Sequence, residues 1–239
     1  MKVDILAIGI HPDDVELSAS GALLRHAAMG LRFGLLDLSA GELGTRGSAE
    51  TRAVEAARAA AILGAAFRET LDIPDGYFIH EPEQWLKIVR VIRDCQPDIV
   101  LCNAPDDRHP DHGRAAKMTL DACFYAGLDK ISTTDRDGYL QAKWRPRAVY
   151  HYIQDRQLTP DFVVDITPFW DKKMEAIRAF RSQFFDPDSQ EPKTPISGAD
   201  FMAFMEAKAR VFGRPIMAEY AEGFIAPRTP GVQNLMELI

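Results

Sequence analysis

Two short polar segments hold the side chains best suited to chemistry. Residues 11–14 read His-Pro-Asp-Asp, and residues 106–112 read Asp-Asp-Arg-His-Pro-Asp-His. Together they supply imidazoles and carboxylates, which are donors that zinc prefers in proteins. A catalytic zinc site commonly uses three protein ligands and leaves a position open for water. His11, Asp14 and His112 form such a set.

Three further residues in these segments suit proton transfer around that ligand set. Zinc lowers the pKa of a water ligand from 15.7 toward about 7, so a neighbouring carboxylate can take its proton at neutral pH. Asp13 suits this base role. His109, when protonated, would stabilise a developing oxyanion and protonate a leaving amine. Asp111 would hold His109 in one orientation and raise its pKa.

Each segment also has a purely structural explanation when it is taken alone. Residues 11–14 suit a helix N-terminus, where acidic side chains are favourable, and residues 106–112 suit a solvated loop. Their joint position favours the metal. Apolar residues at 3 and 5–8 predict a strand before the first segment, and residues 98–102 predict a strand before the second. Because parallel strands end at the same edge of a sheet, we expect the two segments to converge.

The rest of the first half supplies the helices and strands that would hold these segments in place. Apolar periodicity and glycine or proline breaks predict helices at about 17–29, 49–63, 81–94 and 111–125, with further strands at 31–38 and 67–71. This alternation predicts an α/β fold with a mainly parallel sheet. Residues 41–47 hold three glycines, which suggests a tight bend or close approach to a ligand.

The second half is less regular and is expected to form irregular C-terminal additions. It predicts a polar, mobile excursion at 127–146, strands at 148–153 and 162–164, helices at 169–180 and 199–212, a proline-rich loop at 184–197, and a late strand or turn at 218–224. No repeat or linker divides the chain, so we expect a single domain over residues 1–239.

Composition narrows the possible partners and compartment. The 239 residues carry a net charge of −7, without a dense basic block, which argues against nucleic acid or an anionic membrane as partner. No apolar run approaches the roughly 20 residues needed to cross a bilayer, and the N-terminus does not fit a signal peptide. The cysteines are three in number and form no CxxC pair. We therefore expect a reducing cytoplasm.

Residues 11–14 and 109–112 also resemble the signature of the LmbE-like (PIG-L) family of zinc-dependent N-deacetylases. Further matching segments are residues 41–47 with Arg52, residues 107–108, residues 179–184 and residues 220–224. Within the family, the chain looks most like the N-acetylglucosaminyl-malate deacetylases of bacillithiol biosynthesis. The resemblance implies a Rossmann-like three-layer fold and one zinc per subunit, with iron as an alternative in the cell. It also implies a homo-oligomer, with the hexamer as the form common in this subgroup.

The family roles agree with the chemical interpretation of the two segments. By resemblance, His11, Asp14 and His112 match the zinc ligands, Asp13 the general base, His109 the residue that stabilises the tetrahedral intermediate, and Asp111 its orienting partner. The resemblance adds three substrate-binding residues that the residue types alone do not identify. Arg52 matches a sugar-recognition arginine, and Arg108 and Tyr220 match positions that line the pocket. Without the resemblance, Arg52 could equally be a helix-surface residue and Tyr220 a packing residue.

The sequence therefore predicts a zinc-dependent hydrolase that removes acetyl from an N-acetylglucosamine conjugate, most specifically N-acetylglucosaminyl-L-malate. Whether Asp13 or His109 returns the proton to the departing nitrogen stays open. Alternatives are a deacetylase of another such conjugate or of a chito-oligosaccharide, or an amidase acting on a thiol conjugate. A non-hydrolytic nucleotide-binding Rossmann module is disfavoured, because residues 11–14 replace a glycine-rich loop and two carboxylates would repel a pyrophosphate.

Overall fold

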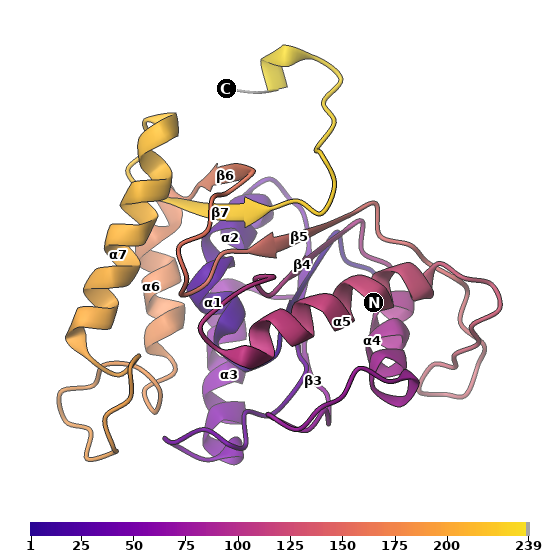
Figure 1. The fold of residues 1–239 in the computed structure, drawn as a ribbon, viewed down its shortest axis with the longest axis horizontal. Helices are drawn as coiled ribbons and strands as arrows, with labels where there is room; N and C mark the ends of the chain where they lie inside the picture. The colour runs from indigo at the N-terminus through magenta and orange to yellow at the C-terminus, as the bar shows by residue number, and fades with distance from the viewer. Residues whose placement is uncertain (238–239) are drawn as a thin grey trace.

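The computed structural model describes residues 1–237 and contains one seven-stranded sheet with helices on both faces (Figure 1). The strand order is β3-β2-β1-β4-β5-β7-β6. The strands are β1 (Ile5–Gly9), β2 (Phe33–Asp37), β3 (Arg68–Thr70), β4 (Ile99–Cys102), β5 (Ala148–Tyr152), β6 (Phe162–Asp165) and β7 (Ala221–Ile225). The α-helices are α1 (Asp14–Ser18), α2 (Ser20–Ala28), α3 (Ala49–Leu63), α4 (Pro82–Cys95), α5 (Pro110–Ala126), α6 (Trp170–Arg178) and α7 (Ala199–Gly213). Three short 3-10 helices complete the described elements: η1 (Thr167–Phe169), η2 (Arg214–Ile216) and η3 (Leu235–Glu237).

The central strands β1, β2 and β4 are largely apolar on both faces because helices cover both faces. In β1, Leu6 and Ile8 pack toward α4 and α5, whereas Ile5 and Ala7 pack toward α2 and α3. This burial on two sides explains why β1 is a continuous apolar run and not an alternating one. The fold is therefore the three-layer α/β arrangement with a mainly parallel sheet that the sequence predicted.

The position of β1 determines where a site can form. β1 pairs in parallel with β2 on one side and with β4 on the other, so the strand order reverses at this point. Ligands of open α/β sheets bind beyond the carboxyl ends of the strands at such a switch point. The loops after β1 and β4 carry residues 11–14 and 106–112, so the predicted convergence has its structural basis here.

The C-terminal half extends the same sheet. β7 runs antiparallel to both β5 and β6, and it lies between them. The segment expected as a late strand or turn is thus an internal strand. Helix α7 stands beside α6 (Figure 1), and side chains of the two helices share one apolar cluster. The chain after β7 then runs away from the body of the molecule (Figure 1).

One predicted helix is divided by a buried ion pair. The sequence predicted a continuous helix at about 17–29, but α1 ends at Ser18 and α2 begins at Ser20. Lys173 Nζ donates to the backbone oxygens of Glu16 and Leu17 at the end of α1 and lies 2.7 Å from Glu222 Oε1. Glu222 in turn accepts the backbone N–H groups of residues 21 and 22 at the start of α2. A cation at one helix end and an anion at the next helix start satisfy the open backbone groups of the break.

Residues 127–146, which were predicted as a polar and mobile excursion, lie outside the named helices and strands, and their first part is tied to α4. Buried Arg93 donates to the backbone oxygens of Ala126, Leu128 and Ile131 and to Thr133 Oγ1. Among the described residues, no helix is both long enough and apolar enough to cross a membrane.

Candidate functional site

A cavity of about 400 Å³ opens at the carboxyl ends of β1 and β4. The structure brings residues 11–14 and 108–112 together in its wall, from loops that follow two neighbouring parallel strands. Helix α7 and the loop before it form the opposite wall, with Ile196, Phe201 and Met205 facing the cavity. The cavity is thus polar on one side and largely apolar on the other.

The turn between β1 and α1 is tight and strained. Asp13 has φ 133° and ψ −24°, which is a conformation that only glycine adopts without strain. At Gly9, a Cβ would lie 2.9 Å from Cβ of Asp14, so glycine is needed where the chain folds back. Arg52 holds the turn from α3, with NH2 donating to the backbone oxygen of Pro12 over 2.8 Å. Such strain persists where surrounding contacts fix it, and it is common at functional sites.

Asp14 is buried, and each of its carboxylate oxygens has a defined partner. Oδ2 accepts from the backbone N–H of His11 and from Asn103 Nδ2, both over 2.9 Å. Oδ1 accepts from Gln154 Nε2 over 3.0 Å and lies 3.2 Å from Nε2 of His112. Burial alone would raise the pKa of Asp14, but the imidazoles of His112 and His11 outweigh it and hold this pKa well below its usual range.

The two histidines at Asp14 each have a second carboxylate on their outer ring nitrogen. His112 Nδ1 lies 2.6 Å from Asp107 Oδ2, and His11 Nε2 lies 3.0 Å from Asp75 Oδ1. Burial opposes protonation, yet Asp14 and Asp107 raise the pKa of His112 to about 10. The pKa of His11 is also raised, because Asp75 and Asp14 outweigh the effect of burial. The carboxylates beside these two imidazoles therefore favour the protonated form of each ring.

This arrangement fits a divalent metal. His112 Nε2 lies 3.2 Å from Asp14 Oδ1, and His11 Nδ1 lies 3.9 Å from Asp14 Oδ2. Tetrahedral ligands with bonds of about 2.0–2.1 Å lie roughly 3.3 Å apart, so His112 already lies at the separation of two such ligands from Asp14, whereas His11 would have to move inward to complete a His-Asp-His set. Metal-bound histidines almost always give their other ring nitrogen to a carboxylate or carbonyl, and Asp107 and Asp75 supply these carboxylates.

Two groupings of nearby side chains have donor atoms that all lie within 4.8 Å of one another, and the set with Asp14 is not one of them. One replaces Asp14 by His109, and the other joins His11 with Asp75 and Asp111. We favour the set with Asp14, because it leaves both outer carboxylates in the supporting positions. The structure gives His109 no carboxylate partner of that kind, and Asp111 is already engaged elsewhere.

His109 lies against both histidines of this set. It is the N-cap of α5, and its ring centroid is 4.8 Å from that of His11 and 5.2 Å from that of His112. Burial and these two imidazoles lower its pKa, and the nearby charge of Asp111 does not reverse this effect. The expected net rise in the pKa of His109 is therefore not found in the metal-free protein.

Asp111 orients His109 in a different way from the one expected. Its backbone N–H donates to His109 Nδ1 over 3.3 Å, whereas its carboxylate accepts from the backbone of Gly76 and pairs with Arg114. The reason is the start of α5, which places residue 111 in the first turn with its side chain toward the loop at residue 76. The carboxylate also lies 3.8 Å from His11 Nε2.

Asp13 is the buried carboxylate that none of these ligand contacts involves. Burial raises its pKa to about 7, although the charge of Arg52 acts in the opposite direction. Arg52 NH2 lies 3.1 Å from Asp13 Oδ2. A carboxylate in this pKa range at the edge of a cavity can exchange a proton near neutral pH.

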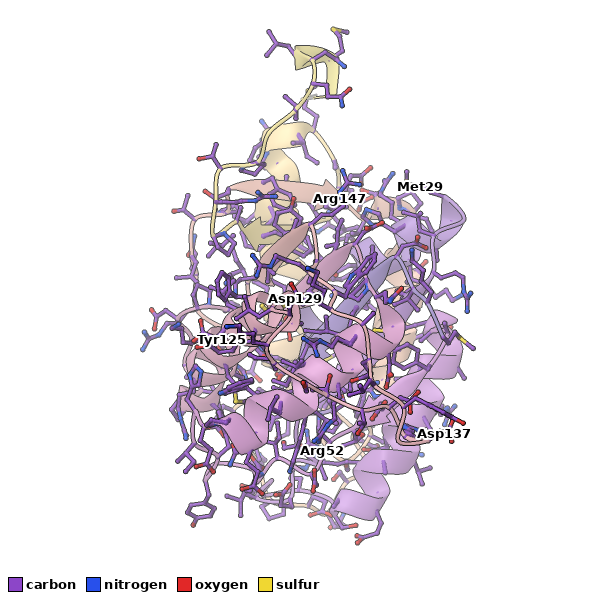
Figure 2. All side chains as sticks on the ribbon, turned by 90° about the vertical axis from the view of Figure 1, so that its right-hand side faces the viewer. Met29, Arg52, Tyr125, Asp129, Asp137 and Arg147 are labelled. Atoms are coloured by element: carbon purple, nitrogen blue, oxygen red, sulfur yellow. The ribbon has the colours of Figure 1, made fainter. Side chains whose placement is uncertain are left out.

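The three expected substrate-binding residues have different locations. Arg52 lines the cavity but is buried, and its NH1 donates to the backbone oxygen of Gly41, whose absent side chain leaves room for the guanidinium. Figure 2 places Arg52 at the opposite end of the molecule from the C-terminal tail. Arg108 lines the cavity and pairs with Asp155. Tyr220 does not line it; the ring stacks on Trp170 at 4.3 Å, and its hydroxyl accepts from Arg210, so packing holds it elsewhere.

Four site residues escaped the sequence analysis as functional residues. Asp75 stands in a Pro-Asp-Gly turn, and Asp107 lies within the second segment without an assigned task. Asn103 and Gln154 follow β4 and β5, and Gln154 Oε1 accepts from Asn103 Nδ2 over 3.1 Å. The only available signal was their place just beyond the carboxyl ends of two parallel strands.

Comparison with known proteins agrees with this geometry. Residues 6–123 match the family described as PIG-L, GlcNAc-PI de-N-acetylase. Diacetylchitobiose deacetylase of Thermococcus kodakarensis is 29% identical over 229 residues, which cover 92% of this chain and 81% of that protein. The crystal structure of a conserved protein from Thermus thermophilus, TT1542, superposes with a TM-score of 0.83 at 35% identity, covering 96% of this chain and 97% of the other.

A relative with different chemistry is also similar. The 4-oxalmesaconate hydratase of Pseudomonas putida is 29% identical over 197 residues, which cover 74% of this chain and 73% of that protein. Similarity alone therefore leaves the reaction to be argued from the site. The family itself is clear, because the matched region contains both polar segments and the strands that precede them. The chain belongs to the PIG-L (LmbE-like) family.

Proposed function

We propose that this protein is a zinc-dependent N-deacetylase of an N-acetylglucosamine conjugate, with N-acetylglucosaminyl-L-malate of bacillithiol biosynthesis as the specific substrate. The observation that carries the proposal is the convergence of Asp14 with Nδ1 of His11 and Nε2 of His112, next to a separate buried carboxylate, Asp13. If these residues had only a structural role, Asp13 would not be needed beside Asp14 in a strained backbone conformation.

His11, Asp14 and His112 would hold the zinc. When bound, zinc acts as a Lewis acid that acidifies water and polarises the acetyl carbonyl. Asp13 would take the proton of the attacking water, and its raised pKa would let it pass that proton on afterwards. Burial beside Arg52 keeps Asp13 away from bulk water and fixes its orientation.

His109 would donate a hydrogen bond to the developing oxyanion. Its Nδ1 accepts from the backbone N–H of Asp111, so the neutral ring carries its proton on Nε2. The lowered pKa of His109 is compatible with this role, because a neutral imidazole still donates from Nε2. Asp13 is then the simpler source of the proton for the departing nitrogen, although His109 also lies in the cavity wall.

Metal content and free-amine release together test the proposal. His112→Ala should lose bound zinc, measured by elemental analysis after dialysis, and should lose activity with it. Asp13→Ala should keep stoichiometric zinc and lose most deacetylation. Loss of metal from Asp13→Ala would make Asp13 a ligand and would overturn the assignment.

A substrate panel identifies the conjugate. N-acetylglucosamine, N-acetylglucosaminyl-malate and diacetylchitobiose should be compared by release of a free amine, and we expect the malate conjugate to have the highest kcat/KM. Preference for diacetylchitobiose would support the chito-oligosaccharide alternative. A thiol conjugate in the same panel tests the amidase alternative.

Hydration of a carbon–carbon double bond is a second candidate reaction, favoured by the similarity to 4-oxalmesaconate hydratase. A metal and a carboxylate base could activate water for addition as well as for hydrolysis. A conjugated unsaturated dicarboxylate should be included in the panel, with loss of ultraviolet absorbance as the readout. Turnover of that compound without any amine release would replace the deacetylase proposal.

A further inference from the structure

Lys208 of α7 occupies the cavity wall opposite the two polar segments. Its ammonium donates to the backbone oxygen of Gln154, whose side-chain amide donates to Asp14 Oδ1 over 3.0 Å. One residue therefore separates Lys208 from the proposed ligand Asp14. The centroid of the Phe204 ring lies 5.6 Å from the ammonium.

Lys208 differs from the arginines that share this cavity. Arg52 pairs with Asp13 over 3.1 Å, Arg114 pairs with Asp111 over 3.0 Å, and Arg108 pairs with Asp155. Within residues 1–237, Lys208 has no carboxylate in ion-pair contact, and the Gln154 carbonyl is its one hydrogen-bond acceptor. An ammonium has three donors, so Lys208 keeps donors for a group that enters the cavity.

The surroundings of Lys208 disfavour a charged ammonium that has no anionic partner. Burial lowers its pKa to about 8, and the nearby ammonium of Lys173 acts in the same direction. Asp155, Asp107 and Glu222 oppose this effect from a distance, and Glu222 is already paired with Lys173 over 2.7 Å. A partly buried cation without an anionic partner is stabilised when a ligand brings one.

We propose that Lys208 binds an anionic oxygen group on the aglycone of the substrate, either a carboxylate or a phosphodiester, and so selects acidic conjugates of N-acetylglucosamine over neutral ones. The inference rests on the proposed deacetylase function and adds a specificity residue on α7 to it. The acetamide would lie at His11, Asp14 and His112, and the aglycone would extend past Gln154 toward α7. A neutral disaccharide would reach the same wall without an anionic partner for the ammonium.

The test compares three variants on three classes of substrate. Lys208→Met removes the charge and keeps the length and apolar contact with Phe204, whereas Lys208→Arg keeps the charge. Lys117→Met removes an exposed lysine of α5 that pairs with Asp121, and it controls for the change in net charge. The substrates are N-acetylglucosaminyl-malate, a methylphosphodiester of N-acetylglucosamine and neutral diacetylchitobiose.

For Lys208→Met, the KM ratio of acidic to neutral substrate should rise at least tenfold, with a smaller change in kcat. Lys208→Arg should keep most of the preference, and Lys117→Met should behave like the original protein on every substrate. Of the malate and phosphodiester substrates, the one whose KM rises more in Lys208→Met identifies the anionic group that Lys208 binds. An equal effect of Lys208→Met on acidic and neutral substrates would overturn the inference, as would an original protein without preference for acidic substrates.

Calorimetric binding separates failure of this inference from failure of the proposed function. The deacetylated amines glucosaminyl-malate and chitobiose need no turnover, so their dissociation constants can be measured in the zinc-loaded protein. Selective weakening of the acidic amine in Lys208→Met would support the role of Lys208 even if no acetyl group were hydrolysed. Thermal unfolding of each variant verifies the fold, and Lys208→Gln, which also removes the charge, takes the place of Lys208→Met if that variant is unstable.

Discussion

The two His-Pro-Asp segments have the same three residues, but their backbones adopt different conformations. Both follow neighbouring parallel strands, β1 and β4. After β1, the helix begins only at Asp14, so Asp13 is left outside it with φ 133°. After β4, the helix begins at Pro110, so His109 is its N-cap and Asp111 lies in its first turn. A shift in where the helix starts changes what the third residue can do.

The electrostatic consequences differ in the same way. Asp13 is buried, its carboxylate faces one cation, and its pKa rises to about 7. The Asp111 carboxylate accepts a backbone N–H from Gly76 and pairs with Arg114, so its oxygens are committed to holding two loops together. Identical motifs can thus supply a proton carrier in one place and a structural anchor in the other. Backbone conformation therefore separates the roles of two aspartates that the sequence pattern does not distinguish.

The largest expected effect separates the two aspartates. Asp13→Asn should lower kcat by about 10²–10⁴-fold with zinc retained, because a general base contributes on this order. Asp111→Asn should lower kcat by less than about tenfold, because an amide oxygen still accepts from Gly76. Single-turnover deacetylation with parallel zinc analysis measures both. Equal losses in the two variants would contradict the division of roles.

The next largest effect distinguishes the histidines of the two segments by their zinc content. His109→Ala should keep zinc and lower kcat by about 10²–10³-fold, the usual effect of losing an oxyanion donor. His11→Ala should instead lose zinc, since His11 presents Nδ1 to the same side as the Asp14 carboxylate. Elemental analysis distinguishes the two variants. An unchanged kcat in His109→Ala would remove His109 from the mechanism.

The arginines that pair with the two aspartates give a smaller, pH-dependent effect. Arg52 lowers the pKa of Asp13, so Arg52→Met should raise it further. A base is active when deprotonated, so the acidic limb of kcat/KM should move to higher pH and activity at pH 7 should fall, by roughly tenfold per unit of pKa. Arg114→Met, the matched change at Asp111, should leave that limb in place.

The pH profile also tests the sugar-recognition role expected of Arg52. A higher KM with an unmoved acidic limb would show that Arg52 acts on substrate and not on Asp13. Movement of the limb together with KM would support both roles.

Local sequence was sufficient to predict the helices and strands that show a clear apolar periodicity. Helix α3 has the predicted bounds, because Ser48 caps its start and Gly64 ends it in a left-handed conformation. The metal-binding proposal could also be made from the sequence, since two polar segments that follow parallel strands must lie at the same edge of the sheet. These inferences needed only spacing and residue type.

Long-range contacts were beyond the sequence. Nothing near Ala19 signals the break between α1 and α2, because Lys173 and Glu222 come from distant elements. The partner of His11 was equally hidden, since Asp75 is 64 residues away in an ordinary turn sequence. Tyr220 matched a pocket position by resemblance, yet packing on Trp170 places it elsewhere. Side-chain partners across the chain depend on tertiary packing that local periodicity does not encode.

The smallest expected effect concerns stability. The difference in stability between a glycine and an alanine variant should have opposite signs at Asp13 and at Asp111. At Asp13, glycine adopts the observed φ without strain, so Asp13→Gly should be more stable than Asp13→Ala by about 1–2 kcal/mol. At Asp111, inside the first turn of α5, Asp111→Gly should be less stable than Asp111→Ala by up to about 1 kcal/mol. Urea unfolding of the metal-free proteins measures both differences. The same sign at both positions would show that the strain at Asp13 does not survive in solution, and the conformational basis of the comparison would fail.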